Sequence, residues 1–448
     1  MRGSSALVVA SAGAFVATLS TSMVAVTMPV IARDLAVSQS SVSWILSAHL
    51  LAASVLLALA GRTADVFGTK RIYLTGFVFF VAGAAMCAAA VELPALVGAR
   101  VLQGAGGAMM MAVGPSIVTR ALPPARRGFG LGIHLAGTYV GLTIGPSLGG
   151  AIASAVSWNA VFLVVAAVGA GAGAIALLLL EPGATDDAPL TRPALRALDL
   201  PGAFLFAIVL GALVIGERLA ATSAPRSATA AVAGVGLVAL LGLVRHEKTC
   251  ESPLLPLSLL RARPFAFGIA GATLLYTTTF TLSFLLPFHL QGELGLSPRS
   301  AGILMTAQPA TMAIVAPLSG RIADRWSPRI PKVCGMVAVA VGLVLLSTPS
   351  TARPASLVTA LSVVGLGAGL FVAPNSAGIM GAAPRERQST AGAMAATARS
   401  VGMTLGIALG AALHQATGFA RGVAIAAGLA ALGAALASLS ERASAERS

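Results

Sequence analysis

The amino-acid sequence predicts an all-α membrane protein made of two six-helix bundles with two further helices inserted between them. Composition, the lengths of the apolar runs and an internal repeat all predict this fold. Of 448 residues, 57% are hydrophobic and 10% are charged, and the mean hydropathy is +0.90. Soluble domains carry about 25% charged residues. Because so few charged groups cannot cover a globular surface, we expect lipid to surround the chain.

The internal repeat is anchored by a short hydrophilic motif. The sequence G-R-x-A-D occurs at 61–65 and again at 320–324, each time between two apolar runs. Pro115 and Arg126 recur as Pro374 and Arg385, and all three anchors are 259 residues apart. A constant offset indicates that the chain consists of two related halves.

The apolar runs divide the chain into predicted membrane spans, since a crossing helix needs about 20 mostly apolar residues. The first and last six spans form the two halves, which we place at 1–182 and 264–439. Linkers and the inserted pair occupy 183–263, and a charged tail occupies 440–448. Fourteen spans are predicted, at 8–31, 43–60, 73–91, 94–118, 129–153, 160–180, 200–216, 228–244, 265–288, 300–319, 333–348, 355–377, 389–413 and 422–438.

The net charge of +14 comes from cations that lie mainly in short loops between the spans. Twenty-one fall on the side that holds both termini and six on the other, while Arg100 and Arg399 lie within spans. The positive-inside rule therefore predicts cytoplasmic termini. Arginine far outnumbers lysine, which indicates a GC-rich bacterial genome and hence a bacterial cytoplasmic membrane. We expect no nucleic-acid partner, because no basic tract is interleaved with aromatic residues.

Several classes of chemistry are disfavoured by the sequence. Cys87, Cys250 and Cys334 show no C-x-x-C spacing, so we expect neither a disulfide nor a metal site. No G-x-x-x-x-G-K-[ST] motif occurs, so ATP is not the expected energy source. No nucleophile–base pair stands out, which argues against an enzyme. We expect no cofactor, and a monomer whose partners are a small-molecule substrate, protons and lipid.

With its repeated loop, fourteen spans and cytoplasmic ends, the chain resembles the major facilitator superfamily, and most of all its fourteen-span drug:proton antiporter branch. The resemblance implies the major facilitator fold. The loop at 61–71 is similar to the family's loop between spans 2 and 3, which latches the cytoplasmic side while the outside is open. A solvated turn that only fixes topology is the alternative. The latch residues implied are Gly61, Arg62, Asp65, Gly68, Arg71, Asp324 and Arg325.

Spans 4 and 5 carry two further motifs of this family. R-V-L-Q-G at 100–104 looks like the family's R-x-x-q-G, which implies a role for Arg100 in proton coupling. The alternative is an arginine that snorkels to the outer interface. G-x-x-x-G-P-x-x-G-G matches the family's antiporter signature, which marks exporters; plain small-residue packing is the alternative. Its residues are Gly141, Gly145, Pro146, Gly149 and Gly150.

The usual proton-carrying acid of the family is missing from span 1. Ser20 stands where the family usually carries Asp, and acids inside the spans are almost absent. His49 in span 2 and His134 in span 5 are therefore the candidates for carrying the proton, since histidine titrates near neutral pH. For each, the alternative is a neutral histidine that is hydrogen-bonded inside the bundle.

Large or polar side chains within the spans predict a substrate cavity. Methionine and aromatic residues suit a promiscuous apolar pocket, although ordinary helix packing is the alternative for each residue taken singly. Arg399 would hold an anionic or carbonyl-bearing substrate, or would pair with Asp324. The predicted cavity residues are Ser20, Met23, Gln103, Tyr139, Tyr276, Phe280, Gln308, Asn375, Met394 and Arg399.

These features predict a secondary active exporter that works by alternating access and expels amphipathic organic compounds, such as drugs or antibiotics, in exchange for protons. One alternative is an exporter or exchanger of one endogenous, anionic metabolite without carboxylate-based proton coupling. A second is a membrane sensor that transports nothing.

Overall fold

The computed structural model describes residues 3–123, 126–180, 198–221, 225–250, 253–325, 329–348, 353–384 and 388–445. Most of these residues are helical, and none of them forms a β-strand. Within these ranges, eleven helices are long and apolar enough to cross a membrane. The all-α membrane fold is therefore confirmed, whereas the count of fourteen spans stays a prediction. Most of the predicted linker after span 6 lies outside the described residues.

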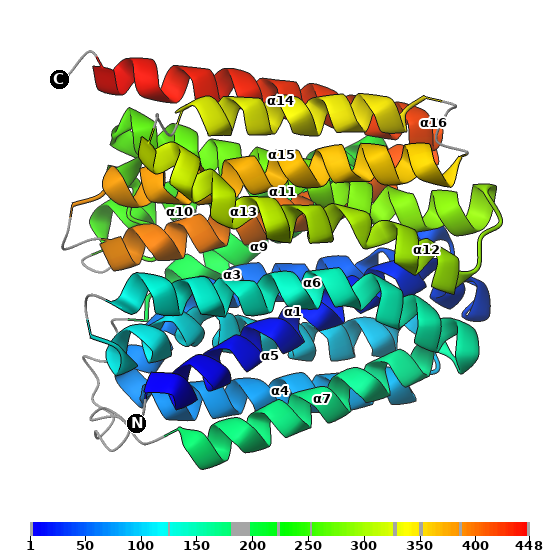
Figure 1. Ribbon diagram of the computed structural model, residues 1–448, viewed down its shortest axis with the longest axis horizontal. Coiled ribbons are helices and arrows are strands. Elements are labelled where there is room, and N and C mark those ends of the chain that lie inside the picture. Colours follow the sequence, from blue (N-terminus) through cyan, green and yellow to red (C-terminus); the bar gives the residue numbers. More distant parts are fainter. Residues whose placement is uncertain are drawn as a thin grey trace. The chain divides into compact units, whose positions relative to one another are not determined.

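The helices follow the predicted spans in order (Figure 1). The first six spans correspond to α1 (Gly3–Asp34), α3 (Trp44–Phe67), α4 (Thr69–Ala89), α5 (Leu93–Ala121), α6 (Arg127–Ala155) and α7 (Trp158–Leu179), with the short α2 (Gln39–Val42) before α3. The inserted pair corresponds to α9 (Leu200–Ala221) and α10 (Arg226–Thr249). The rest of the chain forms η2 (Leu257–Arg261), α11 (Arg263–Phe288), the π-helical turn η3 (His289–Glu293), α12 (Pro298–Met305), α13 (Ala307–Arg325), α14 (Arg329–Leu346), α15 (Pro354–Gly381) and α16 (Gln388–Ala445).

One predicted span differs from the helices that the structure contains. The span predicted at 300–319 is split between α12 and α13. Pro309 lacks the N–H that would bond the carbonyl of Met305, so the helix is interrupted there. The spans predicted at 389–413 and 422–438 correspond to the two parts of α16, which meet at a kink at Gly418, where the backbone is not helical, with φ 74° and ψ −176°. Arg421, predicted in an outer loop, is helical and follows this kink by three residues.

The contacts divide the chain into two compact units. Unit 1 comprises Met1–Ala207, Cys250–Leu254 and Ser297–Gly302. Unit 2 comprises Ile208–Thr249, Leu255–Leu296 and Ile303–Ser448. Helices α1 to α7 thus belong to unit 1, and α10, α11 and α13 to α16 belong to unit 2. The domain bounds that we derived from the sequence stay a prediction.

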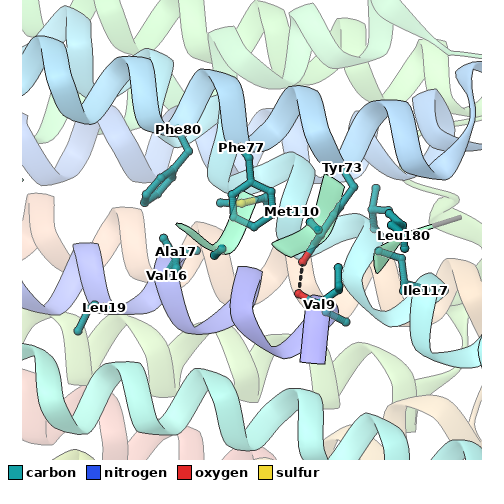
Figure 2. Close-up of a cluster of buried hydrophobic side chains, with 14 of the residues drawn as sticks. Val9, Val16, Ala17, Leu19, Tyr73, Phe77, Phe80, Met110, Ile117 and Leu180 are labelled. Carbon is teal, nitrogen blue, oxygen red and sulfur yellow. Dashed lines mark hydrogen bonds between the residues drawn. The ribbon is translucent and has the colours of Figure 1, made fainter. Parts of the chain in front are cut away.

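Helix α1 is the most deeply buried element of unit 1, and it contacts α5, α6 and α7. In Figure 1 it runs obliquely across α5 and α6. Phe77 and Phe80 of α4 and Met110 of α5 pack into the apolar core beside it (Figure 2). The hydroxyl of Tyr73 donates to the carbonyl oxygen of Val9 at 2.7 Å, which satisfies a phenol that is otherwise enclosed by apolar groups.

Unit 2 repeats the helix pairing of unit 1. In unit 1, α3 packs against α5 and α4 against α5; in unit 2, α13 packs against α15 and α14 against α15. A methyl group on Gly104 would overlap the backbone oxygen of His49, and one on Gly365 would overlap that of Gln308. His49 and Gln308 are 259 residues apart, the offset of the sequence repeat. Equivalent residues of the sequence repeat therefore make equivalent helix contacts in the two units.

Candidate functional site

A buried polar cluster lies between α1, α3 and α5 of unit 1. Nε of Arg100 donates to the backbone oxygen of Ile45 at 3.0 Å, and Nη1 donates to Oγ of Ser20 at 3.4 Å. Oε1 of Gln103 accepts a bond from Nη1 of Arg100, while Nε2 of Gln103 donates to Oγ of Ser20 at 3.1 Å. Arg100, Gln103 and Ser20 are each 0% exposed. The cluster thus joins a residue predicted for proton coupling to two predicted for the cavity.

The Arg100 guanidinium is held by neutral oxygens. Among the residues that the structure describes, no carboxylate bonds to it, and Nη2 has no hydrogen-bond partner. A buried charge is stable only when other groups replace its lost hydration. Ser20 supplies a hydroxyl where an Asp would have supplied a charge, so the site keeps a net positive charge.

His49 and His134 differ in how their rings are satisfied. His49 is 4% exposed, lies in electrostatic contact with Arg100, and its Nδ1 has no partner. Nδ1 of His134 lies 3.1 Å from the backbone oxygen of Ala10 on α1. His134 thus fits the alternative of a hydrogen-bonded histidine within the bundle, whereas Nδ1 of His49 is buried without a hydrogen-bond partner.

The glycines of the antiporter signature lie where α6 approaches α1. A methyl group on Gly141 would lie 2.6 Å from the backbone oxygen of Phe15, and one on Gly149 would lie 2.8 Å from the Cα of Met23. Gly145 faces the hydroxyl of Ser22, which also donates to the carbonyl oxygen of Gly141 at 3.1 Å. Only glycine permits this approach.

The C-terminal end of the signature faces a different segment. Pro146 lies inside α6. A methyl group on Gly302 would overlap the backbone oxygen of Pro146. A methyl group on Gly150 would overlap the backbone oxygen of Pro298. Pro298 and Gly302 belong to the short stretch Ser297–Gly302 of unit 1. Close contacts with neighbouring segments therefore extend along the whole signature.

The predicted latch loop at 61–71 is in fact almost entirely helical, which corrects the prediction of a hydrophilic turn. Helix α3 continues to Phe67 and α4 begins at Thr69, so Gly68 alone joins them. Arginine, threonine and alanine are compatible with a helix, which need not end where the apolar run ends. Arg71 lies in the first turn of α4 and is exposed. The side chains of Asp65, Asp324 and Arg325 lie outside the part of the chain that the structure describes.

Gly68 adopts a backbone conformation that other residues avoid, with φ 94° and ψ 141°. We expect Gly68→Ala to lower stability by about 1–3 kcal/mol, because a Cβ makes this region strained. Gly61→Ala is the matched control: Gly61 is helical and has open space around it, so alanine should be neutral or stabilising. Melting curves of both purified variants measure the difference. Equal melting temperatures would show that Gly68 carries no strain.

Asp199 is a structural anchor that the sequence analysis did not single out. Its Oδ1 accepts from the N–H of Gly202 at 3.0 Å, and its Oδ2 accepts from the N–H of Leu254 at 2.8 Å. Arg62 donates to the neighbouring carbonyl of Pro253. The linker after the inserted pair is thus bound to the end of α3 and the start of α9. An Asp directly before an apolar run is a helix N-cap signal, which was available in the sequence.

Unit 2 contains a pocket between α11, α15 and α16. Its lining combines apolar side chains with the phenol of Tyr276, the carboxamide of Asn375, the hydroxyl of Ser376 and the guanidinium of Arg399. Nδ2 of Asn375 donates to the backbone oxygen of Gly268 at 2.9 Å. Three of the ten predicted cavity residues, Tyr276, Asn375 and Arg399, therefore meet at one pocket.

The other predicted cavity residues are dispersed. Ser20 and Gln103 belong to the Arg100 cluster, and Met23 lies in the apolar core of unit 1. In unit 2, Met394 is buried in an apolar cluster with Phe265 and Ile379. The remaining three are the half-buried Tyr139 on α6, Phe280 against Gly406, and Gln308, whose backbone oxygen faces Gly365.

Comparison with known proteins gives one family. The family model described as Major Facilitator Superfamily matches residues 10–270 and 268–447. The chain is 28% identical over 399 residues to the riboflavin transporter RibZ of Clostridioides difficile, covering 88% of this chain and 84% of the relative. It is 29% identical over 403 residues to the multidrug resistance protein Stp of Mycobacterium tuberculosis, covering 89% and 73%. It is 31% identical over 405 residues to the tetracenomycin C resistance and export protein of Streptomyces glaucescens, covering 88% and 73%.

These matches agree with the helical units and with the repeated contacts inside them. They also agree with the many apolar helices, which make the protein a multi-pass membrane protein. Two of these relatives are named as a transporter and as an export protein, and together with the family match they confirm the expectation that the chain is not an enzyme. The protein is therefore a membrane transporter that belongs to the Major Facilitator Superfamily.

Proposed function

We propose that the protein is a secondary active exporter that expels amphipathic organic compounds, including antibiotics, in exchange for protons. The observation that carries the proposal is the α1–α6 interface, where the glycines of the exporter signature lie against the α1 backbone. The names of two relatives, a multidrug resistance protein and a tetracenomycin C resistance and export protein, support the same direction of transport. Alternating access is the mechanism that we assign to it.

Proton coupling is assigned to Arg100 and His49. The guanidinium is fixed by Ile45, Ser20 and Gln103, and His49 lies beside it with Nδ1 unpartnered. A proton on His49 would place two positive charges close together in a low-dielectric site. Protonation of His49 would therefore destabilise the helix arrangement that holds it beside Arg100, relative to an arrangement that separates the two charges. Such a shift between conformations is what couples proton binding to transport.

Transport into everted membrane vesicles tests the proposal. Vesicles that contain the protein should accumulate a fluorescent amphipathic compound when respiration acidifies their interior, and nigericin should abolish the accumulation by collapsing the pH gradient. Vesicles without the protein provide the baseline. Accumulation that persists after the pH gradient is lost would remove proton coupling from the proposal, and no accumulation would remove export.

Replacing His49 by glutamine is expected to remove accumulation driven by the pH gradient while leaving counterflow exchange of the same compound intact. Glutamine keeps a polar side chain but cannot carry a proton near neutral pH. The wild-type rate should fall as the proton-supplying side is made alkaline, whereas the variant should show no such slope. His134→Gln is the matched control, because His134 already bonds Ala10. A wild-type pH slope in the His49 variant would assign the proton elsewhere.

A second candidate function is the export or exchange of one anionic metabolite. It is favoured by the positive charge of the Arg100 cluster, to which no described carboxylate bonds. Transport of a lipophilic cationic dye against its gradient would count against this candidate, whereas saturable transport of a single anion would favour it over a multidrug role.

A further inference from the structure

The inserted helix α10 has an exposed face that changes from apolar to cationic along its length. Its buried residues, Ala239, Leu243 and Glu247, recur every four positions and so lie on one side of the helix. The residues on the opposite side are exposed and lie three or four positions apart, which makes them neighbours on one face. They are Leu237, Leu241, Arg245 and Lys248. A phospholipid has the same order of groups, since its apolar chains end in a polar headgroup.

The start of α11 adds two more cations at the same boundary of the membrane. The apolar part of α10 ends just before Arg245, and the apolar part of α11 begins just after Arg263. Because the chain leaves the membrane with α10 and enters it again with α11, these two helix ends lie at one interface. Arg261 at the end of η2 and Arg263 are both exposed there. The cation count predicts that this side is cytoplasmic, where anionic lipids make the surface of the leaflet negative.

Contacts within unit 2 hold the linker between these helices in place. Oε2 of Glu247 accepts a hydrogen bond from the backbone N–H of Leu255 at 3.0 Å, which binds the linker to the last turns of α10. Leu259 of η2 is buried in an apolar cluster with Phe265 and Ile379. Helix η2 packs against both α10 and α11. Cations on a backbone that the fold already orders lose less conformational entropy when a ligand binds.

Cations outnumber acids in this segment. Residues 245–263 contain four cations and two acids, Glu247 and Glu251. Glu247 is only 5% exposed, and Glu251 lies outside the described residues. Within the described part of the segment, the exposed charged side chains are therefore all basic. Clusters of four or more basic residues next to a membrane helix are typical of binding to anionic lipids.

We propose that the cations of this segment bind the phosphate headgroup of an anionic phospholipid, and that the exposed apolar face of α10 contacts its acyl chains. The binding residues are Arg245, Lys248, Arg261 and Arg263. This inference concerns the lipid around the protein, so it depends neither on the cargo nor on proton coupling. The alternative is that these cations only fix the topology of the chain, because basic residues gather on one side of a membrane without binding any particular lipid.

Native mass spectrometry of the purified full-length protein, released from a neutral detergent, measures the affinity for the first bound lipid. Phosphatidylglycerol and phosphatidylcholine with identical acyl chains differ only in their headgroups. The wild-type protein should bind phosphatidylglycerol at least about tenfold more tightly, since each basic residue near the headgroup contributes about fivefold in affinity.

Two double variants and one control pair test the assignment. Arg245→Gln with Lys248→Gln, and Arg261→Gln with Arg263→Gln, should each weaken phosphatidylglycerol binding at least about tenfold. Binding of phosphatidylcholine should not change, which also shows that the variants are folded. Arg226→Gln with Arg353→Gln is the control, because it removes the same charge from two exposed positions elsewhere in unit 2. Its affinity for phosphatidylglycerol should be that of the wild type.

Three results would overturn the proposal. They are equal affinity of the wild type for the two lipids, wild-type affinity in both double variants, and an equal loss in the control pair, which would attribute binding to net charge. Glycerol phosphate, which has the phosphate without the acyl chains, separates a lipid site from a site for soluble phosphate. At a concentration equal to that of the lipid it should leave phosphatidylglycerol bound, and displacement would reject the role of the α10 face.

Discussion

Arg100→Gln is expected to lower export driven by the pH gradient by at least about tenfold while the protein remains in the membrane. The guanidinium bonds Ile45, Ser20 and Gln103 at once, and glutamine cannot reach all three. Each buried acceptor left without its donor costs about 1–3 kcal/mol, and a tenfold loss of rate requires only about 1.4 kcal/mol. Transport rates in proteoliposomes at equal protein amounts measure the effect.

Arg100→Lys separates charge from geometry. Lysine keeps the positive charge but presents a compact ammonium group, so it cannot reproduce the fork that joins α1, α3 and α5. We expect it to lose most of the rate as well. Arg226→Gln is the matched control, because Arg226 is exposed at the start of α10. Wild-type rates in both Arg100 variants would show that the cluster has no part in transport.

A purely structural role for Arg100 would give a different pattern. If the residue only held the helices together, its loss would lower the melting temperature and depress counterflow and proton-driven transport equally. If it couples protons to transport, counterflow should survive better than proton-driven transport. The ratio of the two rates therefore distinguishes positioning for coupling from general stabilisation, whatever the melting curves show.

The helical content and the repeat could be predicted from the sequence because both depend on local pattern. Apolar runs fix where helices can lie, and the G-R-x-A-D motif marks equivalent positions in the two halves. Helix ends were harder to predict. The predicted turn at 61–71 is reduced to Gly68, because hydropathy reports where lipid ends and not where backbone hydrogen bonding ends.

The candidate sites were predicted residue by residue but not as groups. Arg100 was assigned to proton coupling, while Ser20 and Gln103 were assigned to a cavity; one set of hydrogen bonds joins all three. Conversely, Met23 and Met394 have side chains of the type that suits a promiscuous pocket, but the structure places both in apolar clusters. Periodicity cannot say which face of an entirely apolar helix meets which neighbour, so these groupings required the tertiary contacts.

Gly104→Ala and Gly365→Ala are expected to destabilise the protein by similar amounts, about 2–3 kcal/mol each. At both positions the added methyl group would overlap a backbone oxygen, that of His49 or that of Gln308. A backbone atom cannot rotate away as a flexible side chain can, so each pair of helices must separate. Thermal unfolding of the purified variants should show a decrease of about 5 °C or more for each.

Matched controls lie on the same two helices. Gly98 of α5 and Gly381 at the end of α15 have open space around them, so alanine there should be neutral or slightly stabilising. A loss of stability in the controls equal to that in Gly104→Ala would attribute the effect to helix propensity rather than to packing. Because the two tight sites lie in different units, their effects should add in the double variant.

Transport rates should distinguish Gly104→Ala from Gly365→Ala even if the two variants lose the same amount of stability. Moving α3 away from α5 displaces His49 and Ile45 from Arg100, so Gly104→Ala should weaken proton-driven transport more than its loss of stability explains. Gly365→Ala displaces Gln308, which belongs to unit 2, whereas the Arg100 cluster belongs to unit 1. Equal loss of proton-driven transport in the two variants would mean that coupling does not depend on the Arg100 cluster, and would contradict the assignment of His49.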